Sequence, residues 1–131
     1  MIRSLSESTT LAATAARAAS DKKGQDTVVL EVGPLLSITD AFVITSGTND
    51  RQVRTIAEEV EAQVKTTLDR APLRVEGLSD ARWILLDYGD VVVHVFHQET
   101  REYYDLERLW ADARRTIWED DGPGRPEAAR A

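Results

Sequence analysis

Residues 81–97, with the sequence ARWILLDYGDVVVHVFH, decide the fold of this 131-residue chain. Two apolar runs, residues 83–86 and 91–96, flank a short polar turn at residues 87–90. Both runs are rich in β-branched and aromatic residues and are too short for typical helices. Gly89 supplies the positive φ that a tight turn requires. The stretch therefore predicts an antiparallel β-hairpin.

The second run of the hairpin carries three consecutive valines, Val91, Val92 and Val93, with no polar alternation. Continuous apolar runs are typical of strands that are covered on both faces. We therefore expect this run to form a central strand. A single hairpin is only marginally stable in water, so the rest of the chain must cover it.

Segments on either side extend the hairpin into an α/β order. Helices are expected at residues 4–23, 49–70 and 99–119, and further strands at residues 27–32, 41–46 and 73–75. The last helix can be broken near Tyr104 and Asp105. The strands at 27–32 and 41–46 are expected to form an antiparallel pair. The fold class that follows is α/β, a single domain with a mixed sheet of about five strands packed by helices.

The two later helices show the clearest patterns. Asn49 is a good N-cap for the helix at 49–70, and Gln52 three residues later fits a capping box. In the last helix, Leu109 belongs to an apolar stripe at helical spacing and is expected in the core. Residues 120–131 lack large apolar side chains and contain Gly and Pro, so we expect a domain at 1–119 and a disordered tail at 120–131.

Composition limits the classes of partner. The net charge is −7 and no stretch is dense in lysine or arginine, which argues against direct nucleic-acid binding and allows a basic protein partner. The chain has no cysteine, so it has no disulfide and no thiolate metal site. No run approaches a membrane span and no secretory signal is visible, so we expect a cytoplasmic protein.

No constellation of residues specifies catalysis. His94 and His97 would point to opposite faces of a strand and cannot share an ion. A lone histidine among apolar residues, such as His94, is more often a hydrogen-bonded core residue. Asp87 and Asp90 flank the turn, where aspartates usually bond their own backbone. The strand-to-helix turn at 46–50 lacks the glycines and lysine of a phosphate loop. The residues therefore favour a binding module over an enzyme, with no cofactor and no metal ion.

The same hairpin carries a resemblance to a known family. Residues 83–96, WILLDYGDVVVHVF, resemble the signature of the ribosomal silencing factor family, also called Iojap. Further landmarks fit that family, namely Ser37, Asp40–Ala41–Phe42–Val43–Ile44, Gly47, Arg51–Gln52–Val53, Glu76–Gly77, Glu99, Arg101, Tyr104, Leu106 and Trp110. The match spans about residues 10–112. Asn49–Asp50 and residues 68–71 depart from the family pattern, and neither departure touches the signature.

The resemblance implies a fold like that of nucleotidyltransferases, without their paired acidic motif, and a function without catalysis. Family members bind the large ribosomal subunit through its ribosomal protein number fourteen. They thereby block joining of the small subunit and repress translation when nutrients are short, and they are often homodimers when free. The alternative is a nucleotide- or metal-dependent transferase that uses Asp40, Asp87 and Asp90.

The hairpin also predicts where a partner binds. Trp83, Leu85 and Asp87 share one face of their strand, and Ile84, Leu86 and Tyr88 share the other. Helices need to cover only one face, so the other is available to a partner, although Trp83 alone can also be read as a core residue. Tyr88 lies at the turn, where we expect exposure. The predicted contact patch is listed here: Trp83, Asp87, Tyr88 and Asp90, extended by His94.

Overall fold

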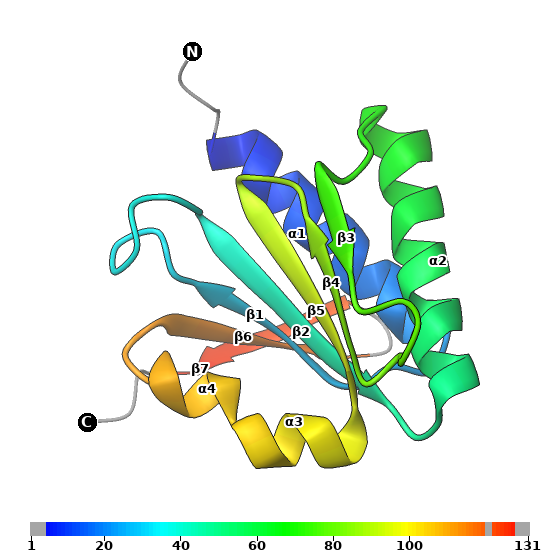
Figure 1. The fold of residues 1–131 in the computed structure, drawn as a ribbon. Helices are drawn as coiled ribbons and strands as arrows, with labels where there is room; N and C mark the ends of the chain where they lie inside the picture. Colours follow the sequence, from blue (N-terminus) through cyan, green and yellow to red (C-terminus); the bar gives the residue numbers. More distant parts are fainter. Residues whose placement is uncertain (1–4, 120–121, 128–131) are drawn as a thin grey trace.

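The computed structural model describes residues 5–119 and 122–127. They form one mixed β-sheet with helices on both faces (Figure 1). The elements, in chain order, are α1 (Leu5–Asp21), β1 (Gln25–Glu31), β2 (Ala41–Gly47), α2 (Asp50–Leu68), β3 (Arg74–Glu76), β4 (Trp83–Asp87), β5 (Val91–His97), α3 (Gln98–Tyr104), α4 (Leu106–Leu109), β6 (Arg114–Glu119) and β7 (Gly122–Glu127).

The sheet contains the predicted hairpin, and neither of its strands is at an edge. Its strand order is β3-β4-β5-β2-β1-β6-β7, so β5 lies between its hairpin partner β4 and strand β2. The pairs β4–β5 and β1–β2 are antiparallel, as expected, and β2 runs parallel to β5. Gly89 adopts φ +89° in the turn. The fold is therefore the predicted α/β class, with seven strands in place of about five.

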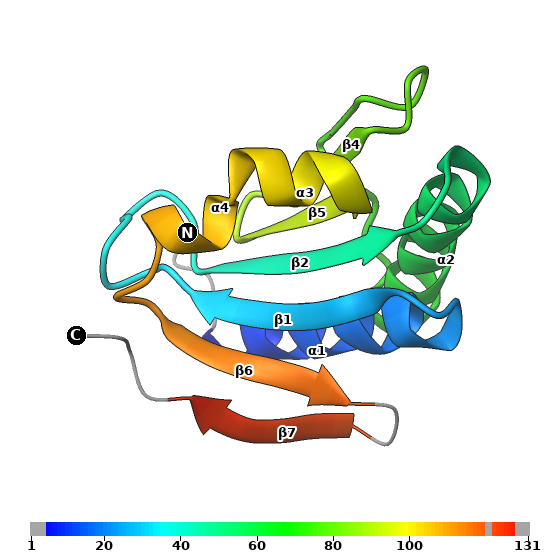
Figure 2. The same cartoon turned by 90° about the horizontal axis from the view of Figure 1, so that it is seen from below.

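Two apolar cores lie on opposite faces of the sheet. Helices α1 and α2 cover one face, and α3 and α4 lie over the other (Figures 1 and 2). The first core joins α1 and α2 to alternate residues of the central strands, such as Val43, Val93 and Val95. The second core lies under α4 and includes Phe42, Ile44 and Phe96. This explains why β5 has no polar alternation, because both of its faces are covered.

Helix α2 forms as its sequence predicts. The Asn49 side chain accepts a hydrogen bond from the backbone N–H of Gln52 at 2.9 Å. The Gln52 side-chain oxygen accepts from the N–H of Thr48 at 2.8 Å, one residue before the position of a standard capping box. The helix buries Val53, Ile56, Ala57, Val60 and Val64 against the sheet. It ends at Asp69, which adopts the left-handed conformation.

The helix expected at residues 99–119 is broken near Tyr104 and Asp105, one of the two expected alternatives, but its expected extension to residue 119 is wrong. Helix α3 ends at Asp105, which has φ +47°, and α4 is one short turn. Residues 114–119 form strand β6, which pairs antiparallel with β1. Leu109 is 76% exposed and is therefore not a core residue. The free edge of β1 supplies backbone partners for an extended segment, and this long-range pairing overrides the local helical spacing.

The C-terminal segment also differs from the sequence-based expectation. Residues 122–127, expected within a disordered tail at 120–131, form β7 and pair with β6. Pro123 and Pro126 have no backbone N–H, which suits an outermost strand. Residues 120–121 and 128–131 lie outside the described part of the chain. Within the described part, no helix is long and apolar enough to cross a lipid bilayer.

Candidate protein-binding surface

The two faces of β4 divide as predicted. Ile84 and Leu86 are fully buried in the core beneath α1 and α2. Trp83, Leu85 and Asp87 alternate with them and are partly exposed on the other face. The strand therefore gives one face to the core, and its other face carries the side chains that a partner can reach.

Tyr88 belongs to the core, so the expectation that it is exposed is wrong. Its side chain is 2% exposed and packs in the α1–α2 core. Burial raises the pKa of its hydroxyl, whose oxygen has no hydrogen-bond partner among the described residues. Tyr88 continues the alternation of β4, and its backbone N–H bonds the carbonyl of Val91 at 2.9 Å. The turn thus aims this ring inward.

Asp90 is also buried, which corrects its assignment to a contact patch. Arg70 donates from Nη2 to Oδ1 at 2.8 Å and from Nη1 to Oδ2 at 3.0 Å, and Ser8 Oγ lies 3.1 Å from Oδ2. Burial acts to raise the pKa of Asp90, but the hydrogen bonds and charge of Arg70 outweigh it and hold that pKa below its ordinary value. The ion pair of Asp90 with Arg70 connects the hairpin turn to the segment after α2, and this carboxylate is not available to a partner.

His94 is 5% exposed and supports the surface from beneath. Its Nδ1 lies 3.1 Å from Nε1 of Trp83, which can only donate, so the proton of the neutral imidazole resides on Nε2. The ring also packs edge-on against Phe42 at a centroid distance of 4.9 Å. His94 therefore fixes the orientation of Trp83. Its burial confirms the interpretation as a hydrogen-bonded core residue and removes it from the predicted contact patch.

Burial lowers the pKa of His94 to about 4, and the negative charge of Asp87 opposes this only in part. The unfolded chain therefore binds the proton more readily than the folded one between about pH 6.5 and 4. We expect the free energy of unfolding to fall by about 2 kcal/mol from pH 7 to pH 5 through this group. Urea denaturation at several pH values measures the loss. The His94→Gln variant should show a flatter profile, and an identical slope would contradict this assignment.

An exposed aromatic cluster lies above Trp83. The ring centroid of Tyr104 is 5.1 Å from that of Trp83, and Tyr103 is 5.0 Å from Tyr104. Tyr103 is 81% exposed and Tyr104 is 53% exposed. We call Trp83, Tyr103 and Tyr104 the aromatic surface. The two tyrosines were not predicted as part of this surface.

Acidic side chains lie near the aromatic surface. Asp87 is on the same face of β4, where it accepts hydrogen bonds from the Gly89 N–H at 2.8 Å and from Arg74 Nη2 at 3.2 Å. Glu102 and Asp105 are exposed beside the two tyrosines along the chain. Exposed rings next to carboxylates are typical of a surface that binds a basic protein partner.

The three aspartates of the alternative transferase do not converge. Asp40 and Asp90 both lie within hydrogen-bond distance of Ser8 Oγ, whereas Asp87 bonds Arg74 and the turn. Within residues 5–119 and 122–127, no group of three or more His, Cys, Asp or Glu side chains is arranged to hold a metal ion. The geometry therefore gives the transferase hypothesis no assembled site.

Comparison with known proteins connects this architecture to a family. The family model described as "Ribosomal silencing factor during starvation" matches residues 5–131. The ribosomal silencing factor RsfS of Bacillus subtilis is 43% identical over 99 residues, which cover 76% of this chain and 83% of that protein. The mouse protein named "mitochondrial assembly of ribosomal large subunit protein 1" is 34% identical over 91 residues, which cover 68% of this chain and 40% of that protein.

A crystal structure of a protein from Chromobacterium violaceum has the same fold. It superposes with a TM-score of 0.73 at 31% sequence identity, and the match covers 98% of this chain and 95% of that one. The hairpin signature, the mixed sheet and these relatives agree with one another. The chain belongs to the ribosomal silencing factor family.

Proposed function

We propose that this chain represses translation in the cytoplasm by binding the large ribosomal subunit through its ribosomal protein number fourteen, thereby blocking the small subunit. The observation that carries the proposal is the aromatic surface, in which the rings of Tyr103 and Tyr104 are exposed and that of Trp83 is partly exposed while it packs against the second core. The opposite face of β4 is packed into the first core. Exposed tyrosine and tryptophan side chains are common anchors of protein interfaces. Membership of the silencing factor family supports a ribosomal partner.

Charge supports the same assignment. The chain has a net charge of −7, and carboxylates such as Asp87 lie on the face that carries Trp83. Complementary charge accelerates encounter with a basic partner, and ribosomal proteins that contact RNA need basic surfaces.

The proposed mechanism is stoichiometric steric blocking, since the three candidate carboxylates do not converge on an assembled catalytic site. Inhibition of subunit joining is expected to saturate near one protein per large subunit. Light scattering of purified subunits mixed with increasing protein measures this ratio, and co-sedimentation with large subunits measures occupancy. Strong inhibition far below one protein per subunit would indicate turnover and overturn the mechanism.

Tyr103→Ala is expected to weaken binding to the large subunit by about 1–3 kcal/mol, as for a moderate interface hot spot. Tyr103 is 81% exposed and its ring packs against that of Tyr104, so the variant should keep the wild-type stability. Affinity from co-sedimentation and the thermal midpoint should be measured on the same preparation.

Ile38→Ala is a matched control, because Ile38 is 75% exposed in the connection between β1 and β2, away from the aromatic surface. It removes a similar exposed apolar group and should bind as the wild type does. Equal affinities for wild type and Tyr103→Ala would remove this tyrosine from the contact, and equal losses in both variants would indicate a non-specific apolar effect.

We also propose that the free chain is a homodimer, as family membership suggests. Sedimentation equilibrium should give a mass near twice 14.6 kDa. If the dimer uses the aromatic surface, Tyr103→Ala should shift it toward monomer. A monomer for the wild-type chain over the micromolar range would contradict the proposal.

A further inference from the structure

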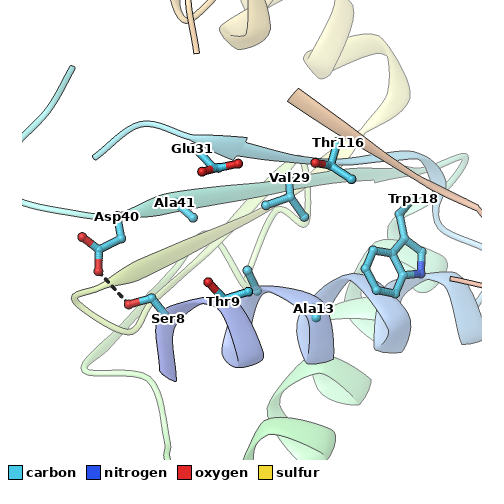
Figure 3. Close-up of a pocket in the computed structure, with 10 residues that line it drawn as sticks. Ser8, Thr9, Ala13, Val29, Glu31, Asp40, Ala41, Thr116 and Trp118 are labelled. Atoms are coloured by element: carbon cyan, nitrogen blue, oxygen red, sulfur yellow. Dashed lines mark hydrogen bonds between the residues drawn. The ribbon is translucent and has the colours of Figure 1, made fainter. Parts of the chain in front are cut away.

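A groove lies on the other side of the sheet from the aromatic surface, between α1 and strands β1 and β6 (Figure 3). Its volume is about 310 Å³. Small side chains create the space, because Ala12 and Ala13 of α1 face Ala41 and Val29 of the sheet. Trp118 of β6 lines the groove and also packs against the α1–α2 core.

The charges in this groove have one sign. Ten residues of the described part of the chain line it, and among these Glu31 and Asp40 are acidic and none is basic. Ser8 Oγ donates to Asp40 Oδ2 at 2.6 Å and so fixes that carboxylate near the start of α1 (Figure 3). Glu31 pairs with Arg114 at 3.5 Å, but both side chains are more than half exposed, so this pair is weak and can be rearranged by an incoming cation.

The carboxylates and the indole lie toward different parts of the groove. In Figure 3, Asp40 and Glu31 are on the side of Ser8, and the ring of Trp118 is on the far side of Ala13. An elongated ligand would therefore meet negative charge with one part and apolar surface with another.

We propose that this groove binds a free small organic cation with an apolar stem, of the alkylguanidinium or alkylammonium class. Its volume is near the lower end of small-ligand pockets, which begin at about 300 Å³, so it accommodates one small molecule rather than a folded partner. The apolar stem would lie along Ala13 and Val29, and the cation would lie between Glu31 and Asp40.

The test uses the full chain and butylguanidinium as the probe, followed by two-dimensional NMR at low ionic strength. We expect saturable shifts at the Trp118 indole N–H and at the backbone amides of Val29 and Thr116. Butylurea, which is neutral and nearly isosteric, should bind at least about tenfold more weakly, because one lost charge contact is worth on the order of 1.4 kcal/mol. Equal binding of the two probes would overturn the role of the carboxylates.

Two variants and one control locate the site. Glu31→Gln should raise the dissociation constant about three- to tenfold, since it removes one of the two charges. Ala13→Leu should abolish saturable shifts by filling the groove, with its thermal midpoint measured to verify folding. Glu58→Gln removes an equal charge from an exposed position on α2 and should change affinity less than twofold. Equal weakening by Glu31→Gln and Glu58→Gln would show a non-specific charge effect.

A blocked Ala-Arg-Ala peptide distinguishes the source of the cation. Weaker binding of the peptide than of butylguanidinium supports a free small molecule, because the peptide backbone does not fit the groove. Tighter binding of the peptide would overturn that assignment in favour of a partner's arginine. No saturable shift with butylguanidinium up to roughly 20 mM would overturn the site itself. None of these readouts depends on the ribosome, so the proposed function is tested separately.

Discussion

Replacing Tyr88 with alanine is expected to lower the free energy of unfolding by about 3–5 kcal/mol, the range for removing a large ring from a packed core. Tyr88 is 2% exposed and is packed in the core beneath α1 and α2. The guanidinium of Arg70 lies 6.0 Å from the centroid of its ring, so the variant would also remove apolar cover from this ion-pairing residue. Urea denaturation monitored by circular dichroism measures the change.

Tyr88→Phe is the matched variant. The hydroxyl oxygen of Tyr88 is buried without a hydrogen-bond partner in the part of the chain that the structure describes. Its removal keeps the ring and relieves an uncompensated polar group, so the free energy of unfolding should change by less than about 1 kcal/mol or rise. A loss of several kcal/mol in Tyr88→Phe would show that the hydroxyl makes a stabilising bond. An unchanged midpoint in Tyr88→Ala would show that the ring is outside the core.

Arg70→Ala is expected to destabilise the domain by about 3–5 kcal/mol, because it leaves the buried carboxylate of Asp90 without its ion-pair partner. Arg70 bonds both oxygens of Asp90 and also donates to the carbonyl of Tyr88 at 2.7 Å. It therefore ties the segment after α2 to the hairpin turn. If the substitution affects only the folded state, the midpoints of thermal unfolding and of urea unfolding should both fall.

The pH dependence of this pair provides a second readout. The pKa of Asp90 is lowered in the folded state, so its stabilising contribution is present above the ordinary carboxyl pKa and is lost as the pH falls through the folded value. In Arg70→Ala the acid-side loss should therefore be smaller than in the wild type. Arg74→Ala is the control, because Arg74 is 68% exposed in its pair with Asp87 and should contribute less than about 1 kcal/mol. Equal losses in both variants would contradict a buried ion pair.

The elements that the sequence predicted well are those whose local signals agree with their tertiary environment. The apolar run at 91–96 is continuous because β5 is covered on both faces, and the turn glycine, Gly89, has the positive φ that it was expected to supply. Asn49 caps α2 as its side-chain chemistry predicts. In these places propensity, periodicity and packing favour the same conformation.

The errors occurred where long-range pairing decides the structure. The spacing of Leu109, Ala113 and Ile117 is compatible with one helix, but α4 ends at Leu109. Residues 114–119 instead form β6 along the edge of β1, a strand far away in the sequence. Segment 122–127 has no apolar signal of its own and is ordered as β7 through backbone pairing with β6. Local composition contains no information about such a free edge.

The candidate surface was predicted only in part, because some of its contacts also join segments that are distant in the sequence. Strand alternation correctly separated Trp83 from Ile84, and the same alternation placed Tyr88 with the buried set. Tyr88 was nevertheless expected to be exposed, because residues at turns usually are. Asp90 was misplaced because its partner, Arg70, lies in another segment of the chain. Only the three-dimensional arrangement brings Tyr103 and Tyr104 beside Trp83.

The parallel contact between β2 and β5 has a consequence for how the chain folds. The other neighbouring strands of the described sheet are antiparallel, so this contact joins two units, β3–β4–β5 and β2–β1–β6–β7. Its partners, such as Ala41 and Val91, are distant in the chain, and closing so long a loop slows folding. Native-state hydrogen exchange should therefore show the β2–β5 amides opening only in global unfolding, while the outer strands β3 and β7 exchange through local openings of lower free energy.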